Sequence, residues 1–188
     1  YDTPLLQELR NEAYQKCIPI SVSAELTLRC NIRCVHCYNF DRDQAAPRPD
    51  HELTFDEWSR IFRELKEEGT IFLNLTGGEP MAHPRFWDLL GEAARLKFAL
   101  TLLSNGTLLT EEHCNRLAAH PELAGISISV YGATPKTHDA ITQVEGSWER
   151  TLRGAERMRD RNIRMTLKFI VMKRNVHEVA EMIELAQQ

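Results

Sequence analysis

The sequence predicts an α/β protein in which five parallel strands alternate with helices. Two observations carry this prediction. Short segments rich in β-branched and apolar residues alternate with amphipathic helical patterns in strict order along the chain. Three of the five segments are apolar almost throughout, which is typical of parallel strands covered on both faces. Such an alternation requires right-handed helical crossovers between neighbouring strands.

The first half of the chain has clear start and stop signals. Thr54 and Glu57 have the spacing of a capping box, and apolar side chains then recur at helical intervals until Gly69 ends the pattern. Pro84 is expected to open the next helix, because proline is favoured in a first turn. A long loop is expected over residues 38–53. The strands are expected at residues 20–28, 70–76 and 98–104, and the helices at 54–69 and 84–96.

The second half continues the same alternation. Thr110 is expected to cap a short helix, and Asn175 and Glu178 are expected to cap the last one. The chain starts at Tyr1 and ends at Gln188 inside a helical pattern, so we expect it to be a piece of a longer protein. The strands are expected at residues 125–131 and 163–172, and the helices at 110–119, 147–161 and 175–186.

The composition excludes several classes of protein. The 188 residues are 43% hydrophobic and 27% charged, which is ordinary for a globular domain. The formal net charge of −4 argues against a protein that binds nucleic acid through its phosphates. No apolar run is long enough to span a membrane, and no secretory signal is visible. We therefore expect a cytoplasmic protein with no membrane partner.

Polar or glycine-rich residues follow all five predicted strands. The carboxyl ends of parallel strands meet at one edge, where folds of this kind carry their chemistry. Turn formation alone could account for one or two such ends, and the turn at 104–106 taken by itself is one of them. The five ends are Cys30–Tyr38, Thr76–Pro80, Ser104–Gly106, Ser129–Gly132 and Lys168–Lys173.

The most specific of these ends is the cysteine loop, residues 30–38. Cys30, Cys34 and Cys37 can bind three irons of a cubane cluster and leave the fourth iron without a protein ligand, whereas ordinary four-iron sites use four cysteines. One alternative is a structural zinc with Cys17 or Cys114 as the fourth ligand, although such sites usually use paired CxxC motifs. Unmodified thiols are another alternative.

The turn Gly77-Gly78-Glu79-Pro80 is the second signal. Two glycines at a strand end would let a ligand approach the backbone without interference from a Cβ. Exposed carbonyl groups and the Glu79 carboxylate would suit an ammonium group. A plain glycine turn is the alternative, and the cysteine loop one strand earlier makes that alternative weak.

Other notable residues favour structural roles. Cys17 and Cys114 are interpreted as buried thiols. The tryptophans fall at core-facing helical positions, namely Trp58, Trp87 and Trp148. Several histidines share no spacing and are expected at the surface or in helix caps, namely His83, His113, His120, His138 and His177.

Five arginines recur at helical spacing, at positions 150, 153, 157, 161 and 164. We interpret this arginine stripe as a solvated face that is partly matched by Glu149, Glu156 and Asp160. Docking of an acidic leader peptide or of an electron donor is the alternative interpretation.

The cysteine triplet and the GGEP turn resemble those of the radical S-adenosylmethionine (radical SAM) superfamily. The resemblance covers nearly the whole chain. The segments CNIRCVHCY, LTGGEP, SNGTLL and SVYGATPKTHDAIT are more narrowly similar to the subgroup with a C-terminal SPASM extension, which includes peptide-modifying maturases and haem-modifying relatives.

The resemblance implies a partial (β/α)6 TIM-like barrel, of which five βα units are present here. Residues 1–19 would be an N-terminal lead-in, and residues 20–188 would be the radical SAM core. The sixth strand would then lie beyond Gln188, so that the core is incomplete at its C-terminus.

The resemblance also implies roles for individual residues. Cys30, Cys34 and Cys37 would ligate a [4Fe–4S] cluster whose open iron chelates the methionine part of SAM. Gly77, Gly78 and Glu79 would hold the SAM amino group. The remaining SAM-binding candidates are Ser129 near the carboxylate or ribose, Asn105 and Lys168 on neighbouring strands, and Tyr38 near the adenine.

The implied chemistry is reductive cleavage of SAM to a 5′-deoxyadenosyl radical that abstracts hydrogen from a substrate. The substrate is expected to be a peptide or protein side chain, with haem or another small molecule as the alternative. Flavodoxin or ferredoxin is expected as the electron donor. A non-catalytic iron–sulfur electron carrier or redox sensor and a zinc-stabilised interaction domain are the alternatives from other classes.

Overall fold

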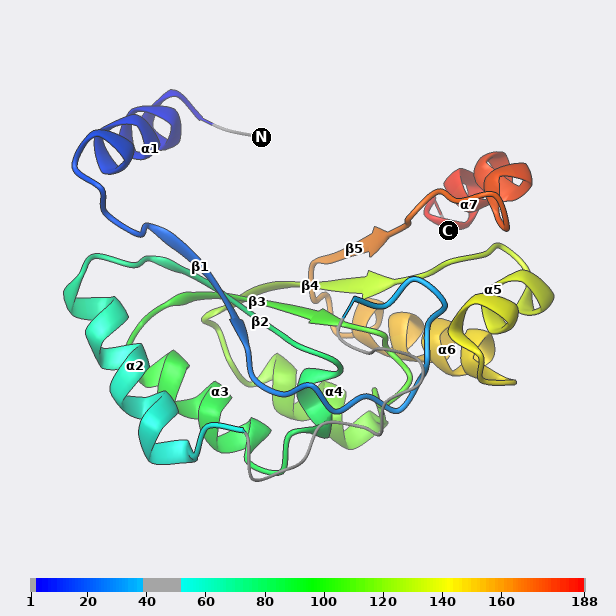
Figure 1. The fold of residues 1–188 in the computed structure, drawn as a ribbon, viewed down its shortest axis with the longest axis horizontal. Coiled ribbons are helices and arrows are strands. Elements are labelled where there is room, and N and C mark those ends of the chain that lie inside the picture. Colours follow the sequence, from blue (N-terminus) through cyan, green and yellow to red (C-terminus); the bar gives the residue numbers. More distant parts are fainter. Residues whose placement is uncertain (1–2, 39–51, 188) are drawn as a thin grey trace.

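Five parallel strands form a single sheet whose order in space is their order along the chain (Figure 1). The computed structural model of the protein describes residues 3–38 and 52–187. Within the described residues β1 and β5 are the two edges, so the sheet is not closed, as a partial barrel requires. The strands are β1 (Ser21–Glu25), β2 (Phe72–Thr76), β3 (Ala99–Ser104), β4 (Leu123–Ser129) and β5 (Met165–Lys168).

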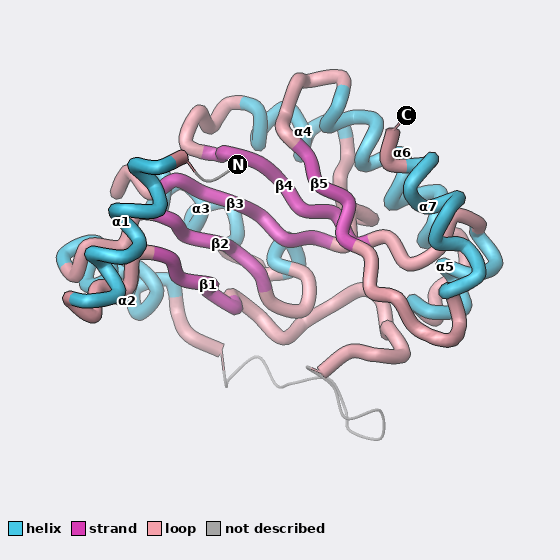
Figure 2. Tube along the Cα trace, turned by 90° about the horizontal axis from the view of Figure 1, so that it is seen from above, coloured by secondary structure: helices cyan, strands magenta, loops and turns pink. Residues whose placement is uncertain are grey.

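Helices cover one face of this sheet. Figure 1 shows α2, α3, α4 and α6 below the sheet, and α1 and α7 above it, next to β1 and β5 respectively. Figure 2 looks down on the face of the sheet that these four helices leave open. The helices are α1 (Pro4–Gln15), α2 (Phe55–Glu67), α3 (Phe86–Arg95), α4 (Glu111–Ala118), α5 (Pro135–Thr142), α6 (Ser147–Arg159) and α7 (Val179–Leu185). Two short 3-10 helices, η2 (Pro80–Ala82) and η3 (Val176–Glu178), lie in the connections.

The hydrophobic core lies between the sheet and the covering helices. Leu73, Leu75, Leu100 and Leu102 of β2 and β3 are fully buried in it, and they pack with apolar side chains of the helices. The alternate position Thr101 is exposed. The expectation that these strands are covered on both faces is therefore wrong for the described residues, because helices pack against one face only.

Most of the predicted elements are confirmed. The capping box is present, with the Thr54 amide donating to Glu57 Oε2 at 2.8 Å. Thr110 Oγ1 accepts from the His113 amide at 3.2 Å and caps α4. Most of the long loop expected at 38–53 lies outside the described residues.

Some elements differ from the prediction. Helices α1 and α5 lie outside the predicted elements, although each begins with a threonine cap followed by a first-turn proline. Strand β5 ends at Lys168, four residues before the predicted end. Asn175 and Glu178 occupy the N-cap positions of η3 and α7, but neither side chain makes a capping hydrogen bond. The Glu178 carboxylate instead accepts from the amides of Ala133 and Thr134.

The tryptophans contribute unequally to the core. Trp58 is buried, whereas Trp87 and Trp148 are half-buried. The indole of Trp148 donates to the Gly132 carbonyl at 3.1 Å, because a partly covered indole N–H still needs a partner.

Among the described residues, none of the helices has both the length and the apolar character that a membrane span needs.

Candidate metal centre and cofactor cavity

A cavity of about 270 Å³ lies at the carboxyl ends of the strands, where the sequence predicts the chemistry. It brings together every predicted site residue except Glu79. The lining residues are Cys30, Ile32, Cys34, His36, Cys37, Tyr38, Thr76, Gly77, Gly78, Leu103, Ser104, Asn105, Ser129, Tyr131, Lys168 and Ile170. Residues from the ends of all five strands therefore meet in one place.

The cysteine loop is held at the end of α5. The Arg33 amide donates to the Thr142 carbonyl at 2.9 Å, and the Val35 amide donates to the Ile141 carbonyl at 2.8 Å. These are carbonyl groups of the last turn of α5, which have no partner within the helix. The loop thus supplies the donors that the helix end lacks, and its own backbone is fixed in return.

The three thiols of this loop have the chemistry of a metal-ligand set. All three are free and line the same cavity. Burial raises the pKa of the Cys34 thiol to about 12, and the neighbouring thiols of Cys30 and Cys37 add to the shift. Thiols bind a metal as thiolates, so binding of a cationic metal favours loss of their protons. The donor set therefore fits a cluster with one open iron.

A buried ring nitrogen at the cavity also fits a bound group. His36 Nδ1 is buried and has no hydrogen-bond partner among the described residues. The His36 ring packs edge-on against Tyr131, with ring centroids 4.6 Å apart. A cavity wall with an unsatisfied polar atom is the arrangement expected where a ligand supplies the missing partner.

The fourth thiolate of a zinc site is not supplied by either remaining cysteine. Cys17 is exposed at the end of α1, before β1, so the expectation that it is buried is wrong. Cys114 is buried in α4, as expected. Neither lines the cavity. In the part of the chain that the structure describes, no three or more His, Cys, Asp or Glu side chains converge on one point where a single metal ion could bind, and this includes the cysteine triplet.

The two glycines of the GGEP turn are required by close packing of the backbone. A Cβ at Gly78 would lie 2.7 Å from the Leu28 carbonyl oxygen, and closer still to that of Arg29. The Gly78 amide donates to the Thr27 carbonyl at 2.7 Å. Gly77 has a φ of +140°, which side chains rarely permit. The turn is thus fitted against residues 27–29, which lead directly into the cysteine loop.

Glu79 lies beneath the cavity rather than in its wall. Its side chain is 0% exposed and accepts from Ser104 Oγ at 3.0 Å, from the Asn105 amide at 2.8 Å and from the Met81 amide at 3.3 Å. Burial raises the pKa of this carboxyl to about 7, although the three donors oppose the shift. Direct contact between Glu79 and a ligand stays a prediction, and its present partners join β2 to the end of β3.

Glu52 is a site residue that the sequence analysis missed. Its carboxylate accepts from Thr27 Oγ1 and from the Leu28 amide, the latter at 3.2 Å, and it lies 3.0 Å from Arg29 Nε. It therefore fixes the segment that precedes Cys30. No local pattern identifies such a carboxylate, because its partners lie more than twenty residues earlier.

Tyr131 connects the predicted SAM residue Ser129 to a buried histidine. Its hydroxyl bonds to Ser129, and its amide donates to His138 Nδ1 at 3.1 Å. His138 is 1% exposed, and burial lowers its pKa to about 4. The expectation that the histidines lie at the surface or in caps is therefore wrong for His138, whereas the buried His83 is the C-cap residue of η2.

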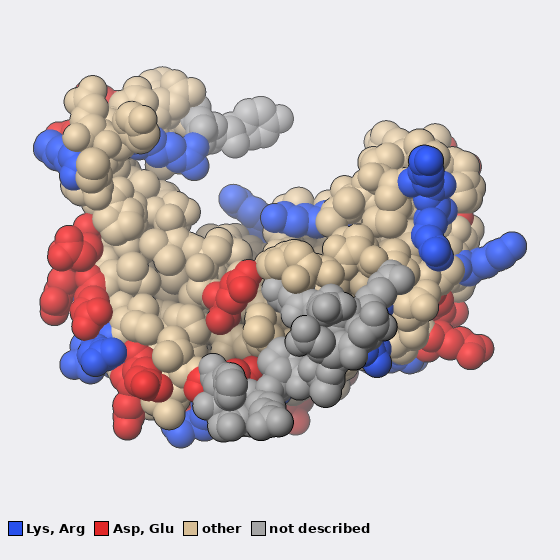
Figure 3. Space-filling view, in the orientation of Figure 1, with Lys and Arg blue, Asp and Glu red and all other residues tan. Residues whose placement is uncertain are grey.

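The two edges of the cavity carry opposite charges. Tyr38 is 79% exposed, and its hydroxyl donates to Glu25 at the end of β1 at 2.5 Å. Lys168, at the end of β5, is exposed and lines the cavity. Figure 3 shows the molecule hollowed between α1 and α7, with acidic side chains along α2 and basic ones around α7. Within the cavity lining itself, Lys168 supplies a positive charge at the β5 edge.

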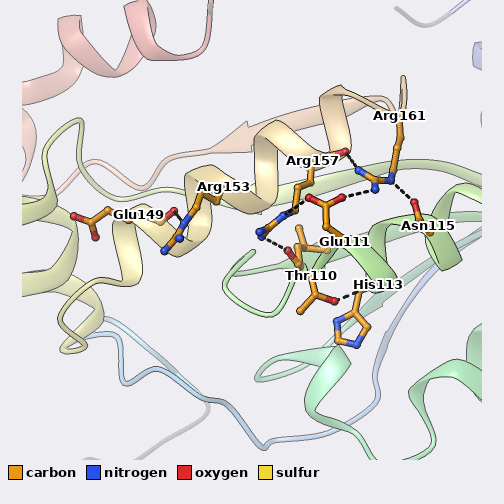
Figure 4. Close-up of polar contacts among 9 residues, drawn as sticks. Thr110, Glu111, His113, Asn115, Glu149, Arg153, Arg157 and Arg161 are labelled. Carbon is orange, nitrogen blue, oxygen red and sulfur yellow. Dashed lines mark hydrogen bonds and ion pairs between the residues drawn. The ribbon is translucent and has the colours of Figure 1, made fainter.

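Two arginines of the stripe, Arg157 and Arg161, join the C-terminal part of α6 and the turn after it to α4 through hydrogen bonds and ion pairs (Figure 4). Arg157 Nε donates to Glu111 Oε1 at 2.9 Å, and Arg161 donates to the other oxygen of the same carboxylate at 2.5 Å. Arg161 Nε also donates to Asn115 Oδ1 at 2.8 Å. The acidic partner of these two arginines is thus on α4, which corrects the expected matching by Glu149, Glu156 and Asp160.

Comparison with known proteins agrees with this site. Residues 24–186 match the family model of the radical SAM superfamily. The chain is 34% identical over 170 residues to an AdoMet-dependent heme synthase of Methanosarcina barkeri, which covers 90% of this chain and 48% of that protein. It is also 34% identical over 168 residues to a PqqA peptide cyclase of Rhizobium meliloti, which covers 89% of this chain and 44% of that protein.

A solved structure shows the same fold. Streptococcus suis SuiB bound to S-adenosylmethionine superposes with a TM-score of 0.76 at 18% identity, over 95% of this chain and 42% of that chain. The chain belongs to the radical SAM superfamily, a family of enzymes that use a [4Fe–4S] cluster and S-adenosylmethionine. Its relatives include peptide-modifying enzymes, which is consistent with a peptide-maturase-like subgroup. The chain spans about half the length of the curated relatives it matches.

Proposed function

We propose that this chain is the core of a radical SAM enzyme that cleaves S-adenosylmethionine reductively and abstracts hydrogen from a peptide or protein side chain. The observation that carries the proposal is the shared cavity. Three free thiols line it together with Ser129 and Lys168 from the far strands. A non-catalytic electron carrier would need the thiols but not the adjoining cavity.

Cys30, Cys34 and Cys37 hold the cluster in this proposal, and the cluster supplies the electron for SAM cleavage when it is bound. The backbone carbonyls of Gly77 and Gly78 accept from the SAM ammonium group. The side chains of the cysteine loop are oriented by the two hydrogen bonds to α5. Glu79, which follows the two glycines in the chain, and Asn105, its hydrogen-bond partner at the end of β3, are expected to support the binding of SAM on this side of the cavity.

The far wall of the cavity fits the rest of SAM. The Lys168 ammonium group has the charge to bind the carboxylate, and Ser129 lies beside it in register on β4. Tyr38 lines the same cavity, and its proposed role is to lie near the adenine. Ile32, Leu103 and Ile170 line the cavity with apolar surface, which excludes water and stray hydrogen donors from the reacting groups.

The substrate class is supported by the relatives. PqqA peptide cyclase and the mycofactocin maturase MftC, at 34% and 30% identity, favour a peptide. The 34% identity to an AdoMet-dependent heme synthase makes haem the second candidate. The remaining proposals concern the whole protein. Residues 1–19 are proposed as an N-terminal lead-in and residues 20–188 as the radical SAM core, with a SPASM extension in the full protein. A flavodoxin or ferredoxin is proposed as the electron donor, and the cytoplasm as the location.

The test is anaerobic reconstitution with iron and sulfide followed by reduction with dithionite in the presence of SAM. Formation of 5′-deoxyadenosine and methionine is expected for the wild-type chain. The triple variant Cys30→Ala, Cys34→Ala, Cys37→Ala should form neither. A wild-type chain that binds a cluster but leaves SAM intact would instead support an electron carrier. Stimulation by candidate precursor peptides, compared with haem precursors, would separate the two substrate classes.

A further inference from the structure

We infer that Asn105 is a positioning residue for the cluster, whose side-chain amide holds the Cys30 sulfur and thereby raises the reduction potential of a cluster bound there. The inference rests on the proposed function. It also gives Asn105 a different role from the SAM contact expected from the sequence, because its side-chain amide already donates hydrogen bonds to the cysteine loop.

Two N–H donors face the sulfur of Cys30. Asn105 Nδ2 lies 3.7 Å from Cys30 Sγ, within hydrogen-bond distance for sulfur. The backbone amide of Ile32 is the second donor. Asn105 is 7% exposed, so its bond to sulfur forms away from bulk water, where such bonds are stronger.

The orientation of the Asn105 amide group is determined by its other partners. The oxygen Oδ1 accepts from the Thr107 amide at 2.9 Å and from Thr107 Oγ1 at 2.6 Å. Only the oxygen of an amide can accept from both, so the nitrogen must face the cysteine loop. There it also donates to Asn31 Oδ1 at 2.9 Å.

These bonds use the hydrogen-bonding groups of Asn105 completely. Its two side-chain N–H groups are engaged by Asn31 and Cys30. Its backbone amide donates to Glu79, and its carbonyl accepts from Thr151 Oγ1 at 2.8 Å. No donor is left for a SAM oxygen. Asn105 therefore acts on SAM only through the cluster ligand.

A donor at this sulfur has a defined effect on redox chemistry. Reduction adds negative charge to a cluster and to its sulfur ligands, so an N–H donor stabilises the reduced form more than the oxidised form. Hydrogen bonds to the sulfurs are among the factors that determine the potential of iron–sulfur clusters. Loss of the Asn105 donor is therefore expected to lower the midpoint potential.

Two variants remove the donor and keep the local turn. In Asn105→Ser the hydroxyl can still accept from the Thr107 amide, but it is too short to reach the sulfur. In Asn105→Asp the carboxylate keeps the turn and places a negative charge at the sulfur. The matched control is Asn74→Asp, which adds the same charge on β2, where Asn74 bonds to Ser23 and Thr101 rather than to a thiol.

The experiment measures iron content and the midpoint potential of the reconstituted full chain by EPR-monitored redox titration. For Asn105→Ser we expect wild-type iron content and a midpoint potential lower by about 59 mV, which corresponds to a roughly tenfold smaller equilibrium constant for one-electron reduction. Asn105→Asp should shift the potential further in the same direction, and Asn74→Asp should shift it less than either.

Three results would overturn the inference. The first is a wild-type potential in both Asn105 variants at wild-type iron content. The second is failure of both variants to take up iron, which would assign Asn105 to folding. The third is an equal shift in Asn74→Asp, which would reduce the effect to charge alone. Cleavage of SAM by the wild-type chain is measured in parallel. If it occurs and the potential is unmoved, the inference fails while the proposed function holds.

Discussion

At the scale of single residues, the site depends on groups whose partners are distant in sequence. Glu79 joins β2 to β3, and Glu52 fixes the segment before the cysteine loop. Such contacts hold the segments that lie next to the thiols. Glu79 and the glycine before it, Gly78, each make a prediction that unfolding measurements can test.

The first prediction concerns Glu79 and pH. The pKa of this buried carboxyl is raised from 4.5 to about 7, mainly by burial. Between these values the folded chain holds a proton that the unfolded chain has lost, so the free energy of unfolding falls as pH rises through this window. At about 1.4 kcal/mol per pH unit, the fall reaches about 3 kcal/mol.

Glu79→Gln should remove this slope, because glutamine keeps the size of the side chain and cannot ionise. Urea unfolding of the wild type and the variant at pH 5 and pH 8 would measure it. We expect the stability difference between the two proteins to change by about 3 kcal/mol between the two pH values. A difference that is independent of pH would contradict the assignment of a buried ionisable carboxyl at this position.

The second prediction compares two glycines. Gly78→Ala places a methyl group against the Leu28 and Arg29 carbonyls and should cost about 1–3 kcal/mol while reducing iron uptake. Gly91→Ala, in α3, meets no atom within 4 Å and should stabilise the chain by about 0.5–1 kcal/mol. Urea unfolding measures both. Equal effects of the two substitutions would show that the turn does not need its glycine.

At the scale of elements, the short helix α5 links the cysteine loop to α6. Its last carbonyls bind the loop, and its Asp139 carboxylate accepts from the Gly146 amide at 2.6 Å, the Trp148 amide at 2.9 Å and Ser147 Oγ at 2.7 Å. Asp139 thus caps α6 from a neighbouring helix. Gly146, the formal cap residue, has no side chain for this purpose.

The third prediction follows from this cap. Asp139→Ala should destabilise the chain by about 1–2 kcal/mol, because the first amides of α6 lose their acceptor. Iron uptake should also slow, since α5 holds the loop. Asp160→Ala is the control, because Asp160 is an exposed residue at the other end of α6. Thermal unfolding and the rate of cluster reconstitution measure the effects. A variant with wild-type values for both would contradict the role of α5 as a link.

The elements were predictable to the extent that their signals are local. The capping box at Thr54 is contained in a few residues and is confirmed. The cysteine spacing is equally local, and the three thiols line one cavity, while their role as cluster ligands stays a prediction. The glycines at 77 and 78 were predicted for ligand approach, whereas their close contact with residues 27–29 depends on strand pairing. His138 gave no signal, because a lone histidine does not show whether it is buried. Helix α5, in contrast, has a local start signal that the sequence analysis overlooked, because Thr134 is a capping residue and Pro135 is a proline in the first turn.

At the scale of the whole molecule, one edge of an open parallel sheet gathers the ends of all five strands into one cavity. The helices pack on one face, and the other face is hollowed between α1 and α7 (Figure 3). The arginine stripe, in turn, serves partly to join α4 and α6. The membership of the chain in the radical SAM superfamily agrees with this division between a packed outer face and an open inner one.

The most direct test of this account is the metal content and EPR spectrum of the anaerobically reconstituted chain, with and without SAM. The account predicts about four irons per chain, as one cubane cluster requires, and a spectrum that changes when SAM binds the open iron. Single alanine variants of Cys30, Cys34 and Cys37 should each lose the cluster, whereas Cys17→Ala and Cys114→Ala should retain it. Bound zinc in place of iron, or a spectrum that SAM leaves unchanged, would contradict the central claim.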